Sequence, residues 1–269
     1  MSKKTLRKRI SLSVFSLLTC TLAIACVTNK ASNRKAIILV SEAKMHQLGD
    51  QAYKETRLKT KRSKDMKLKA TVVRIGKRIA AASGKNFKWH FTLFDAPKTV
   101  NAFCLPGGKV GVYTGIIPVA KTEAGLAAIM GHEVAHAILR HGAERVSHGM
   151  ITKAGLSLAG LAFNDSKYKS GILKALGLGA QVGVILPYSR SHETEADIIG
   201  LKYMAKAGYN PNAAVSLWKR MAKLGGAGKM EILSTHPNPL KRAEALRREI
   251  PKVMGLYNAS TKQPTKNLQ

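Results

Sequence analysis

Apolar residues in the early part of the chain keep the spacing of a helix. No proline occurs between residues 41 and 82, and Val72, Ile75 and Ile79 recur at intervals of three and four. That spacing places them on one face of a helix that packs against a core. The pattern therefore predicts a helical region that precedes the main body of the protein.

From residue 87 the apolar positions change to a period of two. Apolar residues alternate with polar ones over 87–93, which predicts a half-buried strand. Two further strands are expected over 99–105 and 109–114, and the Pro-Gly-Gly at 106–108 supplies the turn between them. Together these segments predict a small antiparallel sheet.

The rest of the chain, as far as Pro251, has helical character. Thr122 is suited to cap a helix that begins at Glu123, and Pro211 suits the first position of another helix. Residues 154–186 are rich in Gly, Ala and Leu, and charged residues interrupt them, so we expect a buried helical hairpin rather than a membrane span. The predicted fold class is α+β and mainly α-helical.

The first 27 residues carry the pattern of an export signal. Five Lys and Arg residues precede a run without charge over 10–27, and small residues stand just before Cys26. This end of the run resembles a bacterial lipoprotein signal, which predicts cleavage before Cys26 and lipid attachment there. A retained membrane anchor is the alternative. Residue 27 is Val and not Asp, which in enteric sorting predicts an outer-membrane location facing the periplasm.

The expected organisation follows from these patterns. We expect a signal peptide over 1–25, a tether over 26–40, a single domain over 41–250 and a tail over 251–269. The first part of the domain, residues 41–85, is basic and helical. The composition, 45% hydrophobic and 22% charged, is that of a globular protein.

Charge suggests an anionic partner. Forty-five Lys and Arg residues against 15 Asp and Glu residues leave a formal net charge of +30. Because export is expected, nucleic acid is not the expected partner, and anionic lipid or lipopolysaccharide takes its place. A basic surface that is merely solvated is the equal alternative. Once residues 1–25 are removed, Cys104 is the only internal thiol, so no intramolecular disulfide is available.

Residues 132–136 read His-Glu-Val-Ala-His, the motif HExxH. On a helix, His132 and His136 lie on one face, where both imidazoles can reach one metal ion. Glu133 stands beside them, where it can take a proton from a water at that metal. A catalytic zinc site uses three protein ligands and keeps one position open, whereas a structural site uses four.

A third ligand must come from elsewhere in the chain. The glycine and histidine that the metzincin class requires after His136 are absent. Glu193 and Asp197 are one helical turn apart, so Glu193 can bind the metal while Asp197 orients a ligand histidine. Glu195 faces another side of that helix, and Glu144 is expected on the helix of His136 itself, which suits both less well.

Four segments in sequence order resemble one known family. It is the zinc endopeptidase family that includes HtpX, BepA and the CaaX prenyl protease, and its soluble periplasmic lipoproteins are especially similar. The segments are residues 101–110, 131–142, 189–197 and 234–242. Cys104 departs from the family pattern, in which Ala is usual at this position.

The resemblance implies a zincin-like catalytic domain that binds one zinc ion. It implies His132, His136 and Glu193 as ligands and Glu133 as the general base. It also implies protein or peptide substrates and an exported quality-control protease. The alternative is an assembly or chaperone-like factor whose metal site is retained but mostly latent.

The late segment adds two further candidates, His236 and Arg242. Arg242 is expected to support the site together with Asp197. His236 has two possible functional roles: it stabilises the oxyanion of the transition state, or it occupies the open position of the zinc and keeps the enzyme latent. We favour latency. A structural zinc site with His236 as its fourth ligand is the third alternative.

Overall fold

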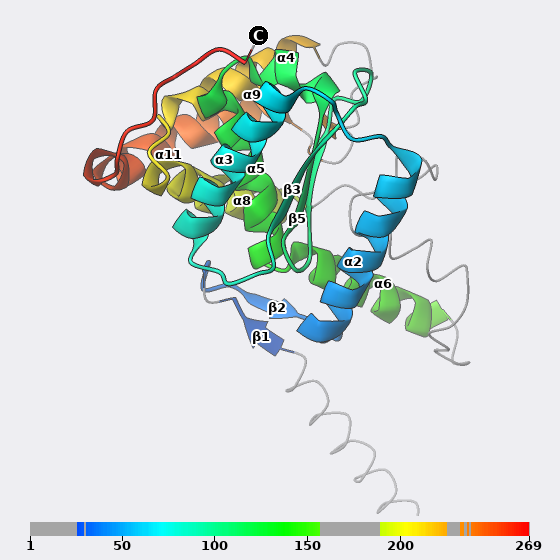
Figure 1. Ribbon diagram of the computed structural model, residues 1–269. Helices are drawn as coiled ribbons and strands as arrows, with labels where there is room; N and C mark the ends of the chain where they lie inside the picture. Colours follow the sequence, from blue (N-terminus) through cyan, green and yellow to red (C-terminus); the bar gives the residue numbers. More distant parts are fainter. Residues whose placement is uncertain are drawn as a thin grey trace, which may run out of the picture.

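A computed structural model describes residues 26–29, 31–156, 189–224, 232–233, 236 and 238–268 (Figure 1). Helices predominate among them, which confirms the mainly α-helical α+β prediction. The elements are β1 (Cys26–Thr28), β2 (Lys35–Ile37), α2 (Glu42–Lys59), α3 (Met66–Ser83), β3 (His90–Phe94), β4 (Ala102–Leu105), β5 (Lys109–Tyr113), the 3-10 turn η1 (Thr114–Ile116), α4 (Ile117–Ala120), α5 (Glu123–Ile138), α6 (His141–Leu156), α8 (Arg190–Lys206), α9 (Asn212–Leu224) and α11 (Pro239–Ala259).

The small sheet is mixed. Its order is β3-β5-β4, and β4 pairs with β5 antiparallel as the Pro-Gly-Gly turn predicts. Gly107 and Gly108 in this turn have φ of 84° and 87°, a conformation that favours glycine. β3, however, runs parallel to β5. The expectation of a purely antiparallel sheet is therefore wrong for β3, because β5 takes the place between β3 and β4.

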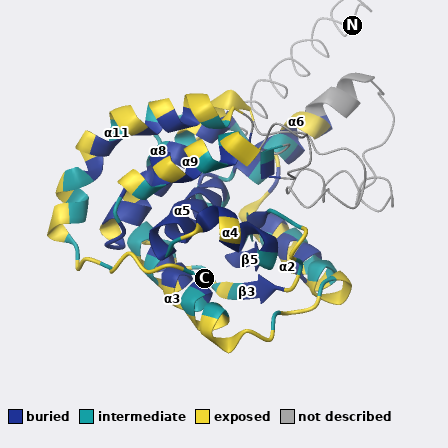
Figure 2. Cartoon of the chain, turned by 90° about the horizontal axis from the view of Figure 1, so that it is seen from above, coloured by how far each residue is buried: buried dark blue, intermediate teal, exposed yellow. Residues whose placement is uncertain are grey.

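Helix α5 forms the centre of the molecule. Every residue from Glu123 to His136 is buried, and in Figure 2 the helix lies between the sheet on one side and α8 and α9 on the other. A helix that is apolar on all sides is stable only when other elements cover it all round. The sequence of α5 thus dictates its central position, and the HExxH motif is carried into the core with it.

Two glycines let α5 and α8 approach closely. A Cβ atom on Gly131 would lie 2.9 Å from the carbonyl oxygen of Gly200, and one on Gly200 would lie 2.8 Å from the carbonyl carbon of Gly131. Any larger residue at either position must push the two backbones apart. The crossing therefore brings the motif on α5 close to the start of α8.

The segment expected to be a tether is folded. β1 and β2 pair antiparallel, with Cys26 opposite Ile37, and Ala36, Ile38 and Val40 are buried at every second position. This short alternation is the signal that the interpretation as a tether overlooked. Residues 1–25 lie outside the described residues, and lipid attachment at Cys26 stays a prediction.

The segment expected to be a tail is also ordered. α11 continues through Pro251 to Ala259, and Pro251 is exposed, so the carbonyl that loses its helical partner can bond to water. Beyond the helix, Lys266 O accepts a hydrogen bond from Glu123 N, and Leu268 N donates to Lys121 O. The prediction of a frayed end is wrong because these backbone groups pair with the start of α5.

The predicted hairpin over 154–186 lies almost entirely outside the described residues. Within the part of the chain that is described, no helix combines the length and the apolar content that crossing a membrane requires.

Candidate metal centre

The beginning of α5 is fixed by local hydrogen bonds. The Thr122 hydroxyl accepts from Gly125 N at 3.1 Å, as predicted for the cap of this helix. Glu123 in the first turn forms an ion pair with Arg74 at 2.7 Å. These contacts set where the helix begins. His132 and His136 then follow on one buried face.

Helix α8 presents two carboxylates to that face. Ser189 caps the helix by accepting from His192 N at 3.2 Å. Glu193 lies in the first turn, where the helix dipole favours a negative charge. Glu193 and Asp197 are both buried, and the spacing of one turn directs both toward α5.

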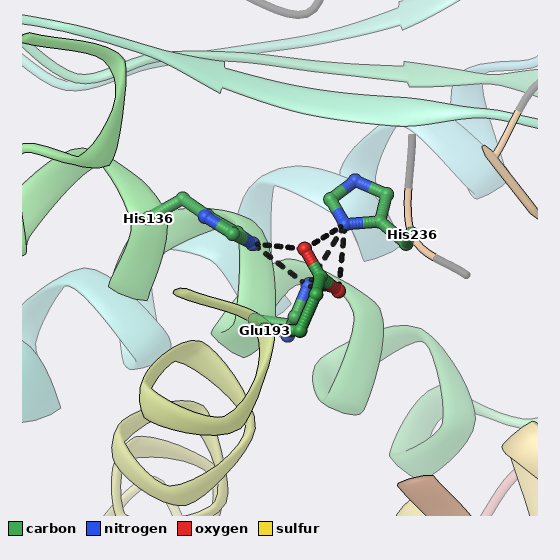
Figure 3. A group of neighbouring side chains, drawn as sticks. His136, Glu193 and His236 are labelled. Carbon is green, nitrogen blue, oxygen red and sulfur yellow. Dashed lines mark hydrogen bonds and ion pairs between the residues drawn. The ribbon is translucent and has the colours of Figure 1, made fainter. Parts of the chain in front are cut away.

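Four buried side chains converge at the crossing. Ligand atoms of His132, His136, Glu193 and His236 all lie within 4.8 Å of one another. The Nε2 atoms of His132 and His136 are 3.0 Å apart, and they lie 3.5 and 3.4 Å from the carboxylate oxygens of Glu193. His236 Nδ1 lies 2.9 Å from Glu193 Oε1. Figure 3 shows His136, Glu193 and His236 pointing toward one another.

The electrostatics of this group fit a bound cation. Burial and Arg242 lower the pKa of His132, but Asp197 and Glu193 outweigh them and raise it to about 9. Burial would raise the pKa of Glu193, yet His236 and Arg242 hold it well below its usual range. The site thus keeps an anionic carboxylate among imidazole nitrogens, and a divalent cation satisfies all of them.

Glu133 lies beside these four side chains but is not one of them. Its side chain is buried, and among the described residues its Oε1 atom has no hydrogen-bond partner. The nearest ionic contact of that atom is His236 Nε2, at 3.6 Å. Burial raises the pKa of Glu133, so this carboxylate has a higher proton affinity than an ordinary glutamate.

Asp197 and Arg242 lie beside this group of side chains. Asp197 Oδ1 lies 3.1 Å from His132 Nδ1, a contact that orients the imidazole and leaves Nε2 directed at the group. Arg242 donates to both oxygens of Asp197, at 2.6 and 2.8 Å, and its guanidinium lies 3.4 Å from the ring centroid of Trp218. The structure thus brings both residues next to the group of potential ligands, and their supporting role stays a prediction.

One histidine beside the site was missed. His141 Nδ1 lies 2.9 Å from His136 Nδ1, and its Nε2 lies 3.0 Å from Glu195. Arg140, with φ of 57°, ends α5 before His141 begins α6. Glu144 is therefore on a separate helix from His136, contrary to expectation. The sequence analysis missed this contact because it did not foresee the break between α5 and α6. In a continuous helix, His141 would point away from His136.

These features define a class of protein. A buried HExxH helix with a glutamate from a second helix beside its two histidines is the arrangement of a zincin-type metalloendopeptidase. The family comparison agrees, because residues 63–250 match the model of Peptidase family M48. The chain belongs to this family, whose members use zinc. Both the predicted enzyme class and the predicted cofactor are thereby confirmed.

Individual relatives share the same region. The chain is 43% identical over 183 residues to the mitochondrial metalloendopeptidase OMA1 of Schizosaccharomyces pombe, covering 67% of this chain and 52% of the relative. It is 37% identical to the protein of that name from Saccharomyces cerevisiae, covering 64% and 50%. It is 28% identical to a beta-barrel assembly-enhancing protease of Yersinia pestis, covering 62% and 36%. The chain thus spans about half or less of the length of these relatives.

These relatives correct the expected location. The predicted outer-membrane location, facing the periplasm, is contradicted by relatives that are named mitochondrial and are 43% and 37% identical. The comparisons also give no support to a membrane, anionic-lipid or lipopolysaccharide partner. The misleading signals were the small residues before Cys26 and the high basic charge, because neither specifies one membrane.

Proposed function

We propose that this chain is a zinc metalloendopeptidase in which His132, His136 and Glu193 hold the metal and Glu133 is the general base. One observation carries the proposal. Glu133 is buried directly beside the group of potential metal ligands, and within the described part of the chain one of its carboxylate oxygens has no hydrogen-bond partner. A site that only held a structural ion would have no need of this second, uncoordinated carboxylate.

The proposed division of labour follows from the geometry. Zinc, when bound, supplies a Lewis acid that lowers the pKa of a water molecule and polarises the scissile carbonyl. Glu133, whose pKa burial raises, takes the proton of the attacking water and delivers it to the leaving amine. Asp197 keeps His132 in its orientation, and Arg242 holds Asp197 in turn.

Substitution of the two glutamates tests the proposal. Glu133→Gln should keep zinc and lose hydrolysis by about three orders of magnitude, because a general base and part of the transition-state stabilisation are lost together. Glu193→Ala should lose the metal instead. Metal analysis and cleavage of casein measure both properties.

Stoichiometric zinc in Glu193→Ala would remove Glu193 from the ligand set. Zinc-loaded wild-type protein that hydrolyses no extended substrate would favour the alternative, an assembly or chaperone-like factor with a latent site.

The substrate is proposed to bind as an added strand. Among the described strands, β4 pairs only with β5, and it packs close to α5. We propose that the edge of β4 that faces away from β5 offers backbone groups to an extended peptide. N-methylation at alternate residues removes every second backbone N–H donor of a peptide. KM should rise only when the methylated amides are those that would bond to β4. Equal KM values for both sets of methylated amides would contradict strand addition.

Such binding suits segments that are not folded. We therefore extend the proposal to protein quality control, in which incompletely folded chains are the substrates. The name of the Yersinia pestis relative, a protease that enhances assembly, is in line with this role. A protein that is cleaved at the same rate folded and unfolded would contradict it.

His236 is proposed to keep the site latent. Its Nδ1 atom lies 3.3 Å from His132 Nε2 as well as next to Glu193, which is where a fourth ligand would lie. Substrate would then have to displace His236 before the open position of the zinc becomes available.

A further inference from the structure

A chain of polar contacts links the N-terminal hairpin, residues 26–37, to a proposed zinc ligand. Arg34 Nε donates to Glu195 Oε2 at 2.7 Å. The same oxygen lies 3.0 Å from His141 Nε2, and His141 Nδ1 lies 2.9 Å from His136 Nδ1. The hairpin, α8, α6 and α5 each contribute one member, so residues far apart in the sequence meet in one relay.

Arg34 joins two carboxylates from different helices. Besides Glu195 on α8, its guanidinium donates to both oxygens of Glu144 on α6. The side chains of Glu144 and Glu195 are only 7% and 15% exposed, so their charges need a partner. Glu144 also lies 3.0 Å from His192, whose ring stacks on His141 with centroids 4.2 Å apart. Arg34 thus closes a cluster that surrounds His141.

The direction of the hydrogen bonds gives the relay its chemistry. The carboxylate of Glu195 can only accept, so His141 carries its proton on Nε2 and leaves Nδ1 as an acceptor. His136 must then donate from its own Nδ1. Its Nε2 atom, which faces Glu193 at 3.4 Å, keeps the lone pair that a metal requires.

We infer that Arg34 is a positioning residue for His136, and that its contact with Glu195 therefore strengthens metal binding. This inference rests on the proposed zinc site. Arg34 acts by fixing Glu195, which fixes the tautomer of His141, which in turn orients the His136 imidazole. Because linkage is reciprocal, bound metal also stabilises the contact of Arg34 with Glu195.

The release of zinc to a chelator tests the inference in the full chain. Glu195→Gln replaces the anionic acceptor of His141 by a neutral amide, which can donate as well as accept, and should speed zinc release by about 10-fold or more, as is typical when the hydrogen-bond support of a ligand histidine is disturbed. Arg34→Ala acts one contact further away and should speed release by about 3- to 10-fold. The double variant should release zinc no faster than Glu195→Gln alone, because both act through one path.

The hairpin itself provides the matched control. Asn29 also ties the hairpin to the body, since its Nδ2 atom donates to Leu139 O at 2.7 Å, but among the described residues no hydrogen bond joins its side chain to Glu195 or His141. Asn29→Ala should loosen docking and leave zinc release near the wild-type rate. Equal acceleration in Asn29→Ala and Arg34→Ala would overturn the inference, because Arg34 would then act only through docking.

Two further measurements do not depend on catalysis. The visible spectrum of the cobalt-substituted protein should change in Arg34→Ala and recover in part in Arg34→Lys, because lysine keeps the charge but not the forked geometry. Zinc should slow hydrogen exchange at the amides of β2, and exchange that ignores zinc would contradict the reciprocal coupling. Wild-type protein that binds no zinc would instead refute the proposed function itself.

Discussion

Glu133 and Glu193 are two carboxylates in one buried site with opposite electrostatic surroundings. Burial dominates at Glu133 and raises its pKa. At Glu193 the same burial is outweighed by His236 and Arg242, which keep the carboxylate ionised. In the proposed mechanism Glu133 gains and loses a proton while Glu193 stays anionic, and their neighbours alone produce this difference.

His236 allows a test at the same scale. If it occupies the fourth position, His236→Ala should raise peptidase activity while zinc stays bound, because substrate no longer competes with the imidazole. Peptide cleavage and metal content should be measured on the same preparation. Lower activity with zinc retained would assign His236 to the oxyanion instead, and no change in either quantity would leave it without a role.

At the scale of elements, the sequence predicted where helices and strands lie better than which of them lie side by side. Thr122 and the apolar run after it predicted α5, and the one-turn spacing of Glu193 and Asp197 predicted the helix that faces it. The position of β5 between β3 and β4 could not be predicted, because alternation identifies a strand but not its partner. The contact between His141 and His136 depends on the left-handed Arg140, and nothing in the local pattern demands that conformation.

The glycine crossing of α5 and α8 gives a prediction for these elements. Gly200→Ala should lower zinc affinity and cost about 1–3 kcal/mol of stability, because the new Cβ meets the backbone of Gly131 at 2.8 Å. Gly255→Ala is the control, since a Cβ there meets nothing within 4 Å and alanine favours a helix. Thermal unfolding and zinc titration of both variants measure the effect, and similar results for the two would show that the crossing tolerates a side chain.

At the scale of the whole molecule, both ends of the described chain form hydrogen bonds with the ends of the central helix, α5. Asn29 bonds to the carbonyl of Leu139 at the end of α5, and Lys266 accepts from Glu123 at its beginning. The sequence analysis assigned both ends to a tether and a tail, because the alternation of Ala36, Ile38 and Val40 is short and the end of the chain shows no apolar period. Polar contacts with partners that are distant in sequence contribute to the order of both ends.

The dependence of the protein's stability on pH should report on how the N-terminal hairpin is held to the rest of the molecule. Burial would raise the pKa of Glu144, but hydrogen bonds from His192 and Arg34 hold it well below its ordinary 4.5. The unfolded chain therefore takes up a proton at about pH 4.5 that the native chain does not, so this stabilisation is present above that pH and is lost as the pH falls toward the native pKa. The Nε2 atom of His148 also faces this carboxylate, at 3.8 Å from Glu144 Oε1.

Glu144→Gln should therefore lose stability at neutral pH and show a flatter dependence between pH 5 and about pH 3. Circular dichroism of acid unfolding measures this, with the exposed Glu244→Gln as the control. Parallel pH profiles for wild type and Glu144→Gln would show that this carboxylate does not govern acid stability.

The pairing of the last residues with the start of α5 has a consequence for biosynthesis. A ribosome releases residues 261–268 after every other described segment, and domains fold as their segments emerge. Until then the amide of Glu123 lacks the carbonyl of Lys266, and the helix that carries HExxH has an open first turn. In a nascent chain, the hydrogen bonds at the start of this helix are therefore complete only once residues 261–268 have left the ribosome.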